Sequence, residues 1–194
     1  MPSRLGQTSP VDTLVVAVAN YALYAVALGA VGAWLLTPRE GKLQLAVAAV
    51  IAAVAVLIAV KVSGAIWADP RPFVVDGRPP LIPHAAENGF PSDHTTTATA
   101  IAVVVLSVRR WWGAALLALA LALGLARVAA DVHHVPDIVG GMAIGAFCAA
   151  VGVLLARRVV ASLDAHGALR RPRTRAAEPA GRPADDGQPA RPDQ

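Results

Sequence analysis

The amino-acid sequence predicts an all-α fold: a polytopic membrane helical bundle with about five transmembrane helices in one domain. Hydrophobic residues make up 56% of the 194-residue chain, whereas Asp, Glu, Lys and Arg together make up only 15%. These charged residues cluster between apolar runs that are long enough to cross the roughly 30 Å hydrocarbon core of a bilayer at about 1.5 Å per residue. An ordinary soluble domain has neither feature.

The first two apolar runs cover residues 13–37 and 43–67. The first has no charged residue, and the second has only Lys61, near its far end. A short, charged turn at residues 38–42 is expected to join them. Residues 1–12 are short and polar, so we expect an N-terminal segment that caps the bundle or lies on the membrane surface.

A long connection, residues 68–91, follows the second run. It contains six prolines, and connections of this length inside a compact domain are usually functional or disordered. A third helix is expected to begin at Ser92 or Asp93, either of which makes a good N-cap, and to continue to Val108.

The last two apolar runs cover residues 111–126 and 138–156. They flank the polar stretch 127–137, which places a strong cation, two imidazoles and two carboxylates at the junction of two membrane helices. Ionisable groups in such a place are costly and are therefore candidates for function. Pro136 suits the first turn of the last helix.

Five spans place the two chain ends on opposite sides of the membrane. Most Lys and Arg residues between spans then share one side with the arginine-rich tail, and the positive-inside bias makes that side cytoplasmic. We therefore expect a multi-pass plasma-membrane protein with a transmembrane domain at residues 13–158. Residues 163–194 lack apolar periodicity and are expected to form a disordered cytoplasmic tail. This charge distribution explains the net charge of +4 without a nucleic-acid partner.

Three separated polar segments converge on the extracytoplasmic side. Their cations, imidazoles and free helix-start N–H groups describe an anion site, and phosphate is the anion expected at a membrane surface. The candidate residues of this site are Lys61, Arg71, Ser92, His94, Arg127, His133 and Asp137.

These residue types permit phosphoryl transfer through an imidazole. His133 can attack phosphorus while Asp137 holds its other ring nitrogen, and His94 can give a proton to the leaving oxygen and then activate water. A shift of one residue would make His134 the nucleophile, so the residues alone leave this choice open. No acidic cluster is arranged for magnesium and no Cys/His set for zinc, so we expect neither a metal nor another cofactor.

The combined pattern resembles the type 2 phosphatidic acid phosphatase superfamily over about residues 11–158. Three signature motifs of that family are similar to segments of this chain: Arg71-Pro72, Pro91-Ser92-Asp93-His94, and Arg127 followed by His133 and Asp137 at the family's spacing. The likeness is closest to the bacitracin-resistance branch, the undecaprenyl diphosphate phosphatases. That branch also has Asp in the second motif and a run similar to Leu81-Ile82-Pro83-His84.

The resemblance implies a role for each candidate. His133, and not His134, would be the nucleophile, Asp137 would orient it, and His94 would be the general acid. The phosphate would be bound by Arg71, Ser92 and Arg127.

Two positions depart from the family pattern. Ala126 stands where the third motif usually has Ser, and Gly64 stands where the first motif usually has Lys. Lys61 lies three residues before Gly64, on nearly the same helix face, and is the candidate replacement. Its side chain leans towards the helix N-terminus, away from the site, so the alternatives are an ion pair with Asp69 or a lysine that only anchors the helix end.

The expected function is hydrolysis of undecaprenyl (polyprenyl) diphosphate to the monophosphate and inorganic phosphate through a phosphohistidine, which would recycle the lipid carrier of cell-wall synthesis. The partners would be this lipid substrate and membrane lipids. One alternative is a broader lipid phosphatase that acts on phosphatidic acid or phosphatidylglycerophosphate. Others are a vanadate-dependent haloperoxidase, which the membrane spans argue against, and a non-enzymatic transporter or scaffold with a degenerate site.

Overall fold

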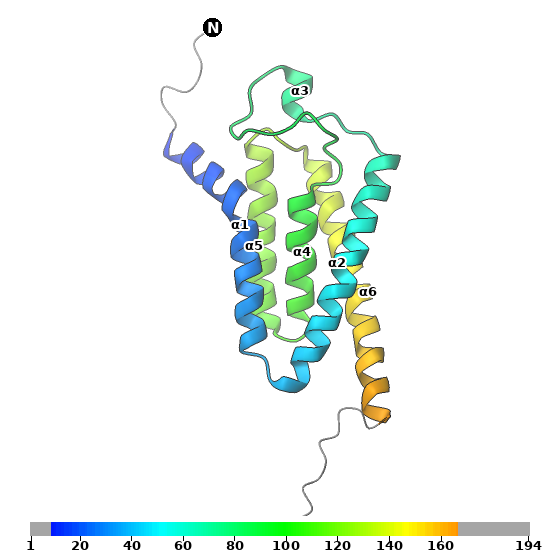
Figure 1. Cartoon of the computed structure of the whole chain (residues 1–194). Coiled ribbons are helices and arrows are strands. Elements are labelled where there is room, and N and C mark those ends of the chain that lie inside the picture. The colour runs from blue at the N-terminus through cyan, green and yellow to red at the C-terminus, as the bar shows by residue number, and fades with distance from the viewer. Residues whose placement is uncertain (1–8, 167–194) are drawn as a thin grey trace, which may run out of the picture.

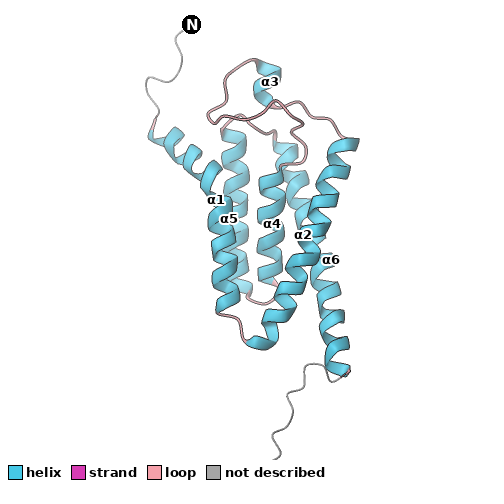
Figure 2. Ribbon diagram, in the orientation of Figure 1, coloured by secondary structure: helices cyan, strands magenta, loops and turns pink. Residues whose placement is uncertain are grey.

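A computed structural model describes residues 9–166 of the chain. Within this range the chain forms six α-helices and no β-strand, which confirms the predicted all-α fold class. The helices are α1 (Pro10–Leu35), α2 (Arg39–Ile66), α3 (Pro72–Asp76), α4 (Asp93–Leu106), α5 (Arg110–Ala129) and α6 (Val135–Ala165). The long helices lie side by side, and the short α3 sits in the connection that covers one end of the bundle (Figures 1 and 2).

Four of these helices are long and apolar enough to cross a membrane: α1, residues 41–66 of α2, α5 and α6. The predicted count of about five corresponds to these four and α4. With 14 residues, α4 is about 21 Å long at about 1.5 Å per residue. It packs against α1, α2, α5 and α6, so the bundle closes around it, and its N-terminal end lies below the upper ends of α2 and α5 in Figure 1.

Two helix boundaries differ from the prediction. The charged residues after Pro38 form the first turn of α2 and not a loop, because Pro38 itself takes the N-cap position. At the other end of the chain, α6 continues past Arg157 and Arg158 to Ala165. Arginine is a good helix former, so these two charged residues mark the end of the membrane span but do not end the helix. Residues 167–194 of the predicted tail lie outside the described residues.

Small residues allow the helix backbones to approach closely. A Cβ at Gly145 of α6 would collide with the backbone oxygen of Thr96 in α4, and one at Gly141 would lie 2.9 Å from the Thr96 Oγ1 atom. Spacing small residues four apart in this way is the usual device for packing helices within a membrane. The seam fixes the start of α4 against the start of α6.

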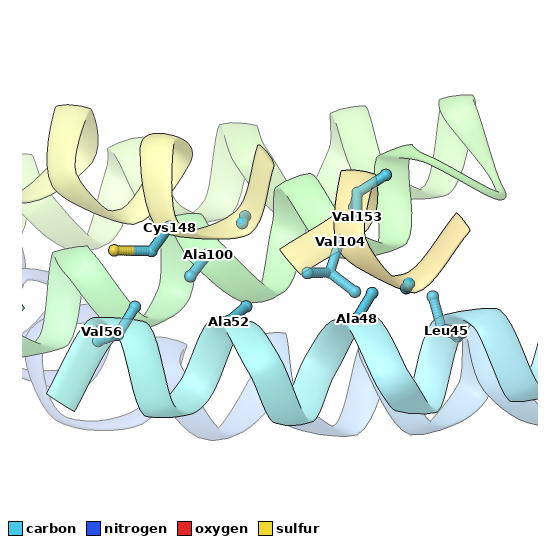
Figure 3. Close-up of a cluster of buried hydrophobic side chains, with 10 residues drawn as sticks. Leu45, Ala48, Ala52, Val56, Ala100, Val104, Cys148 and Val153 are labelled. Carbon is cyan, nitrogen blue, oxygen red and sulfur yellow. The ribbon is translucent and has the colours of Figure 1, made fainter. Parts of the chain in front are cut away.

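A second seam joins α2 to α6 and α4 through alanine and valine. Figure 3 shows Ala52 of α2 facing Ala100 of α4 near Cys148 of α6, and Ala48 of α2 facing Val104 and Val153. Cys148 is buried and belongs to this core as a packing residue. The seam leaves the upper end of α2 beside the start of α4, where the polar residues gather.

Candidate active site

The polar residues converge on a cavity of about 440 Å³ at the end of the bundle beneath the 67–92 connection. Its walls come from α2, the connection, α4, α5 and the turn between α5 and α6. Five of the predicted site residues line it, namely Lys61, Arg71, His94, Arg127 and His133. The other two, Ser92 and Asp137, are fully buried.

A tight turn between α5 and α6 positions His133. Asp131 adopts a left-handed conformation (φ 61°), which short polar side chains such as Asp tolerate best among residues with a Cβ. Beyond it, the His133 Nδ1 atom lies 3.2 Å from Asp137 Oδ2, which also accepts a hydrogen bond of 2.9 Å from the backbone N–H of His134. The start of α6 thus holds the carboxylate against the imidazole.

The partners of His133 determine where its proton lies. The Arg71 Nη1 atom lies 3.3 Å from His133 Nε2 and donates to the Val132 carbonyl oxygen at 2.9 Å. A guanidinium can only donate, so Nε2 is the acceptor and Nδ1 carries the proton that it donates to Asp137. This tautomer, inferred from the hydrogen-bond network, leaves the Nε2 lone pair as the nucleophilic position.

The surroundings of His133 keep its imidazole neutral. Burial lowers the pKa of His133 below its ordinary value, and the positive charges of Arg71 and Arg127 lower it further, whereas the hydrogen bond to Asp137 opposes this shift. A neutral imidazole at physiological pH is the form that can attack phosphorus.

Both arginines of the cavity retain unused donors. Arg71 and Arg127 are 7% and 2% exposed, and the Nε atom of each is buried without a hydrogen-bond partner among the residues that the structure describes. An unpaired buried N–H is costly. An anion with several oxygens, such as a phosphate, supplies the missing acceptors to both side chains at once.

His84 is a cavity residue that was missed as a candidate. Its Nε2 atom lies 3.3 Å from Arg127 Nη2, and its ring meets that of His133 edge to face with centroids 6.2 Å apart. Burial, followed by the charges of Arg71 and Arg127, lowers the pKa of His84 to about 4. His84 is therefore neutral and accepts from Arg127, which leaves its Nδ1–H free to donate.

The structure places Ser92 behind the cavity wall. It is the N-cap of α4, its Oγ atom lies 3.2 Å from Thr95 Oγ1, and its backbone N–H donates to the Asp137 carbonyl oxygen at 3.2 Å. In this arrangement Ser92 joins α4 to α6. A direct contact between Ser92 and phosphate stays a prediction.

Lys61 and Gly64 both line the cavity, but Gly64 also has a packing role. The Asn88 side chain donates to the carbonyl oxygens of Gly64 and Trp67 at 2.8 and 2.9 Å, so it seats the connection on the last turn of α2. A Cβ at Gly64 would lie 3.2 Å from the Phe90 carbonyl oxygen. No salt bridge among residues 9–166 includes Lys61, and the Asp69 carboxylate lies beside His134 instead.

Comparison with known proteins identifies the family to which this constellation belongs. Residues 42–160 match the family model described as the PAP2 superfamily. The chain belongs to this superfamily. It is 33% identical over 136 residues to undecaprenyl-diphosphatase BcrC of Bacillus subtilis (strain 168), with 70% of each chain covered. It is 32% identical over 142 residues to the bacitracin transport permease protein BcrC of Bacillus licheniformis, with 73% of this chain and 70% of the relative covered.

A solved structure supports the fold. The crystal structure of Aquifex aeolicus LpxE matches with a TM-score of 0.57 and 22% identity, covering 77% of this chain and 89% of that chain. The predicted resemblance, including its bacitracin-resistance branch, is confirmed. The chain is a multi-pass membrane phosphatase of the PAP2 superfamily, homologous to an undecaprenyl-diphosphatase.

Proposed function

We propose that the protein hydrolyses undecaprenyl diphosphate, or a closely related polyprenyl diphosphate, to the monophosphate and inorganic phosphate. The observation that carries this proposal is an apolar groove of about 570 Å³ whose walls lie one helical turn from those of the polar cavity on both α2 and α4. Leu57 of α2 and Thr97 of α4 line the groove. One helical turn further along the same helices, Lys61 and His94 line the cavity.

The groove suits a long apolar chain. It runs between α1, α2 and α4 and reaches down to Leu45 of α2, about 18 Å from Leu57 at about 1.5 Å per residue. Its walls are mostly alanine, valine and leucine, and α4 lies between α1 and α2 in Figure 1. A prenyl chain can lie in this groove while its diphosphate enters the cavity. The apolar chain then stays in apolar surroundings, and the charged diphosphate stays in polar ones.

The proposed reaction has two steps. His133 Nε2 attacks the terminal phosphorus, the bond from this phosphorus to the bridging oxygen breaks, and His94 gives a proton to the leaving prenyl monophosphate. His94 then accepts a proton from a water molecule whose oxygen attacks the phosphohistidine, which releases inorganic phosphate and restores His133.

Three further residues stabilise charge during the proposed reaction. Asp137 stabilises the imidazole when it becomes positively charged, as a carboxylate held against Nδ1–H does. Arg71 and Arg127 donate to the oxygens of the transferring phosphoryl group, where negative charge is held in the transition state. The Arg71 Nη1 atom lies 3.3 Å from His133 Nε2. A phosphate bound between Arg71 and His133 would therefore contact both the nucleophile and a hydrogen-bond donor.

Phosphate release from a panel of lipids tests the substrate. Purified protein is assayed with undecaprenyl diphosphate, undecaprenyl monophosphate, phosphatidic acid and phosphatidylglycerophosphate, and the His133→Ala protein measures the background. We expect the highest kcat/KM on the diphosphate. An equal or higher kcat/KM on phosphatidic acid or phosphatidylglycerophosphate would instead establish the broader lipid phosphatase.

The proposal includes the extracytoplasmic side of the plasma membrane, where hydrolysis would recycle the cell-wall lipid carrier. It is supported by Lys42, Arg109 and Arg110, which lie at the end of the bundle opposite the cavity and favour a cytoplasmic location for that end. A membrane-impermeant thiol reagent on intact cells should label Asp76→Cys but not Asp164→Cys, both in a Cys148→Ala background. Labelling of Asp164→Cys alone would move the site to the cytoplasm.

A further inference from the structure

The carboxylate that holds His133 has an unused oxygen. Asp137 Oδ2 accepts from both His133 and His134, whereas Oδ1 is buried and has no hydrogen-bond partner within residues 9–166. Asp137 is 0% exposed. A buried carboxylate oxygen without a donor is unfavourable, so this position calls for a positively charged or protonated partner.

Two more potential ligands surround this position. The connection after α2 brings in Asp69, whose Oδ1 atom lies 3.5 Å from His134 Nδ1. Ligand atoms of Asp69, His134 and Asp137 all lie within 4.8 Å of one another, the one such group found in the described part of the chain. Backbone contacts fix Asp69 in place, because its N–H donates to Asn88 Oδ1 at 2.7 Å and its carbonyl accepts from Gly89 at 2.8 Å.

Neighbouring carboxylates at this spacing repel each other. When ionised, both are acceptors only, and the buried His134 Nδ1 atom has no hydrogen-bond partner in the described residues. Burial, followed by the neighbouring Asp137, raises the pKa of Asp69. The cluster therefore brings one possible ligand atom from each of three side chains within 4.8 Å of the others.

The ligand types select the kind of cation. One imidazole nitrogen and two carboxylate oxygens suit zinc and its neighbours, whereas magnesium and calcium prefer oxygen ligands alone. The 3.5 Å between Asp69 Oδ1 and His134 Nδ1 matches the edge of a tetrahedron with metal–ligand bonds of about 2.1 Å. Side-chain exposures of 23% for Asp69 and 37% for His134 give a cation access from water.

We propose that Asp69, His134 and Asp137 form a binding site for a zinc-class divalent cation, and that occupation of this site inhibits the phosphatase. A cation bound to Asp137 competes with His133 for the carboxylate that otherwise orients and stabilises the imidazole. Its double positive charge also disfavours the positively charged form of the His133 imidazole. The inhibition rests on the proposed role of Asp137 in phosphoryl transfer, whereas the binding of the cation does not.

The experiment measures binding and activity separately. Purified full-length protein is treated with EDTA and dialysed, after which zinc binding is followed by calorimetry and phosphate release is measured in the same zinc titration. His134→Ala and Asp69→Asn each remove one ligand and leave the cavity residues intact. His166→Ala removes an exposed histidine at the C-cap of α6 and is the matched control.

We expect zinc to bind the wild-type protein with one-to-one stoichiometry and to inhibit phosphate release over the same concentration range, while magnesium does neither. Both ligand variants should lose roughly tenfold or more in zinc affinity and in sensitivity to zinc, because a metal–ligand bond is lost, and His166→Ala should match the wild type. Equal zinc affinity in wild type and His134→Ala, or no binding at all, overturns the site. Zinc that binds through these ligands without inhibiting overturns the inhibition. Absence of phosphate release before any zinc is added counts against the proposed function, not against the metal site.

Discussion

The polar cavity and the apolar groove share α2 and α4 but are built in different ways. The cavity takes residues from five separate parts of the chain, and side chains such as Arg71 and Asn88 are fixed by hydrogen bonds to backbone carbonyls. The groove takes its walls from the faces of three helices, and Thr97 is its one hydroxyl among apolar side chains. A phosphoryl group must be positioned closely against a nucleophile, whereas a lipid tail needs only room. Changes in the cavity should therefore cost orders of magnitude in rate, and changes in the groove much less.

The largest effect is expected at the nucleophile. His133→Ala should lower turnover by roughly 10³-fold or more, and Asp137→Asn should be comparably severe, because an amide cannot stabilise a charged imidazole. Adjacent His134→Ala is the matched control and should keep most of the activity, since only the backbone N–H of His134 serves Asp137. Initial rates of phosphate release measure these losses. A larger loss in His134→Ala than in His133→Ala would show that His134 is the nucleophile.

A second prediction separates arginine from metal as the source of positive charge in the cavity. Vanadate should inhibit nearly completely, because it adopts the five-coordinate geometry of the phosphorus and binds the donors of Arg71 and Arg127. Phosphate release should survive excess EDTA. Loss of activity in EDTA that magnesium restores would contradict this mechanism.

A third prediction tests the groove. Ala53 of α2 is exposed and lines the groove, so Ala53→Trp should lower kcat/KM on undecaprenyl diphosphate by about tenfold, as expected when a chain loses its apolar contacts. The same protein should hydrolyse a prenyl diphosphate of one isoprene unit at the wild-type rate. Val54→Trp, on the exposed neighbour outside the groove, is the control. Equal losses in both variants, or on both substrates, would show that the tail lies elsewhere.

Lys61 lines the cavity one helical turn from Leu57 of the groove, and its effect should be smaller. Loss of one charge–phosphate contact in Lys61→Ala should raise KM roughly threefold to tenfold with little change in kcat. Adding Gly64→Lys should restore part of this loss. Full restoration is not expected, because a side chain at position 64 must displace the Phe90 carbonyl by a few tenths of an ångström. Normal kinetics in a stable Lys61→Ala protein would place Lys61 outside the site.

The smallest effect concerns protonation of the nucleophile. Burial and the two arginines lower the pKa of His133 below the ordinary value of 6.5. The ring should therefore stay neutral as the pH falls to 6.5 and gain its proton only below that value. Side-chain NMR of detergent-solubilised protein, with His133→Ala to assign the signal, measures the midpoint. A midpoint above 6.5 would mean that Asp137 outweighs burial.

The sequence predicted the parts of the site that lie at helix ends in a fixed spacing. Arg127, His133 and Asp137 are close in the chain, so one helix end and one tight turn suffice to bring them together. His84 and Asp69 could not be found in this way, because their positions depend on the path of the 67–92 connection. That path is set by tertiary hydrogen bonds, above all those of Asn88 to the last turn of α2, which leave no periodic signal in the sequence.

Features that depend on how the helices pack together could not be predicted from the sequence either. Ser92 was expected to contact phosphate as a helix-start residue; its hydroxyl lies beside Thr95 of the same helix, and its contact with phosphate stays a prediction. The apolar groove was not predicted either. Hydropathy marks the residues of α1 and α2 as membrane-facing but does not show that the two helices pack on α4 rather than on each other.

The adjacency of cavity and groove along α2 and α4 has a consequence for the release of products. The proposed reaction divides one amphiphile into two products that belong in different phases. Inorganic phosphate can leave past Glu87 and Asp93, two exposed residues of the cavity wall, while the lipid monophosphate moves along the groove into the bilayer. Neither product obstructs the other, so the tightly sealed α4–α6 seam never has to open, and the helix that positions the site can remain rigid throughout the catalytic cycle.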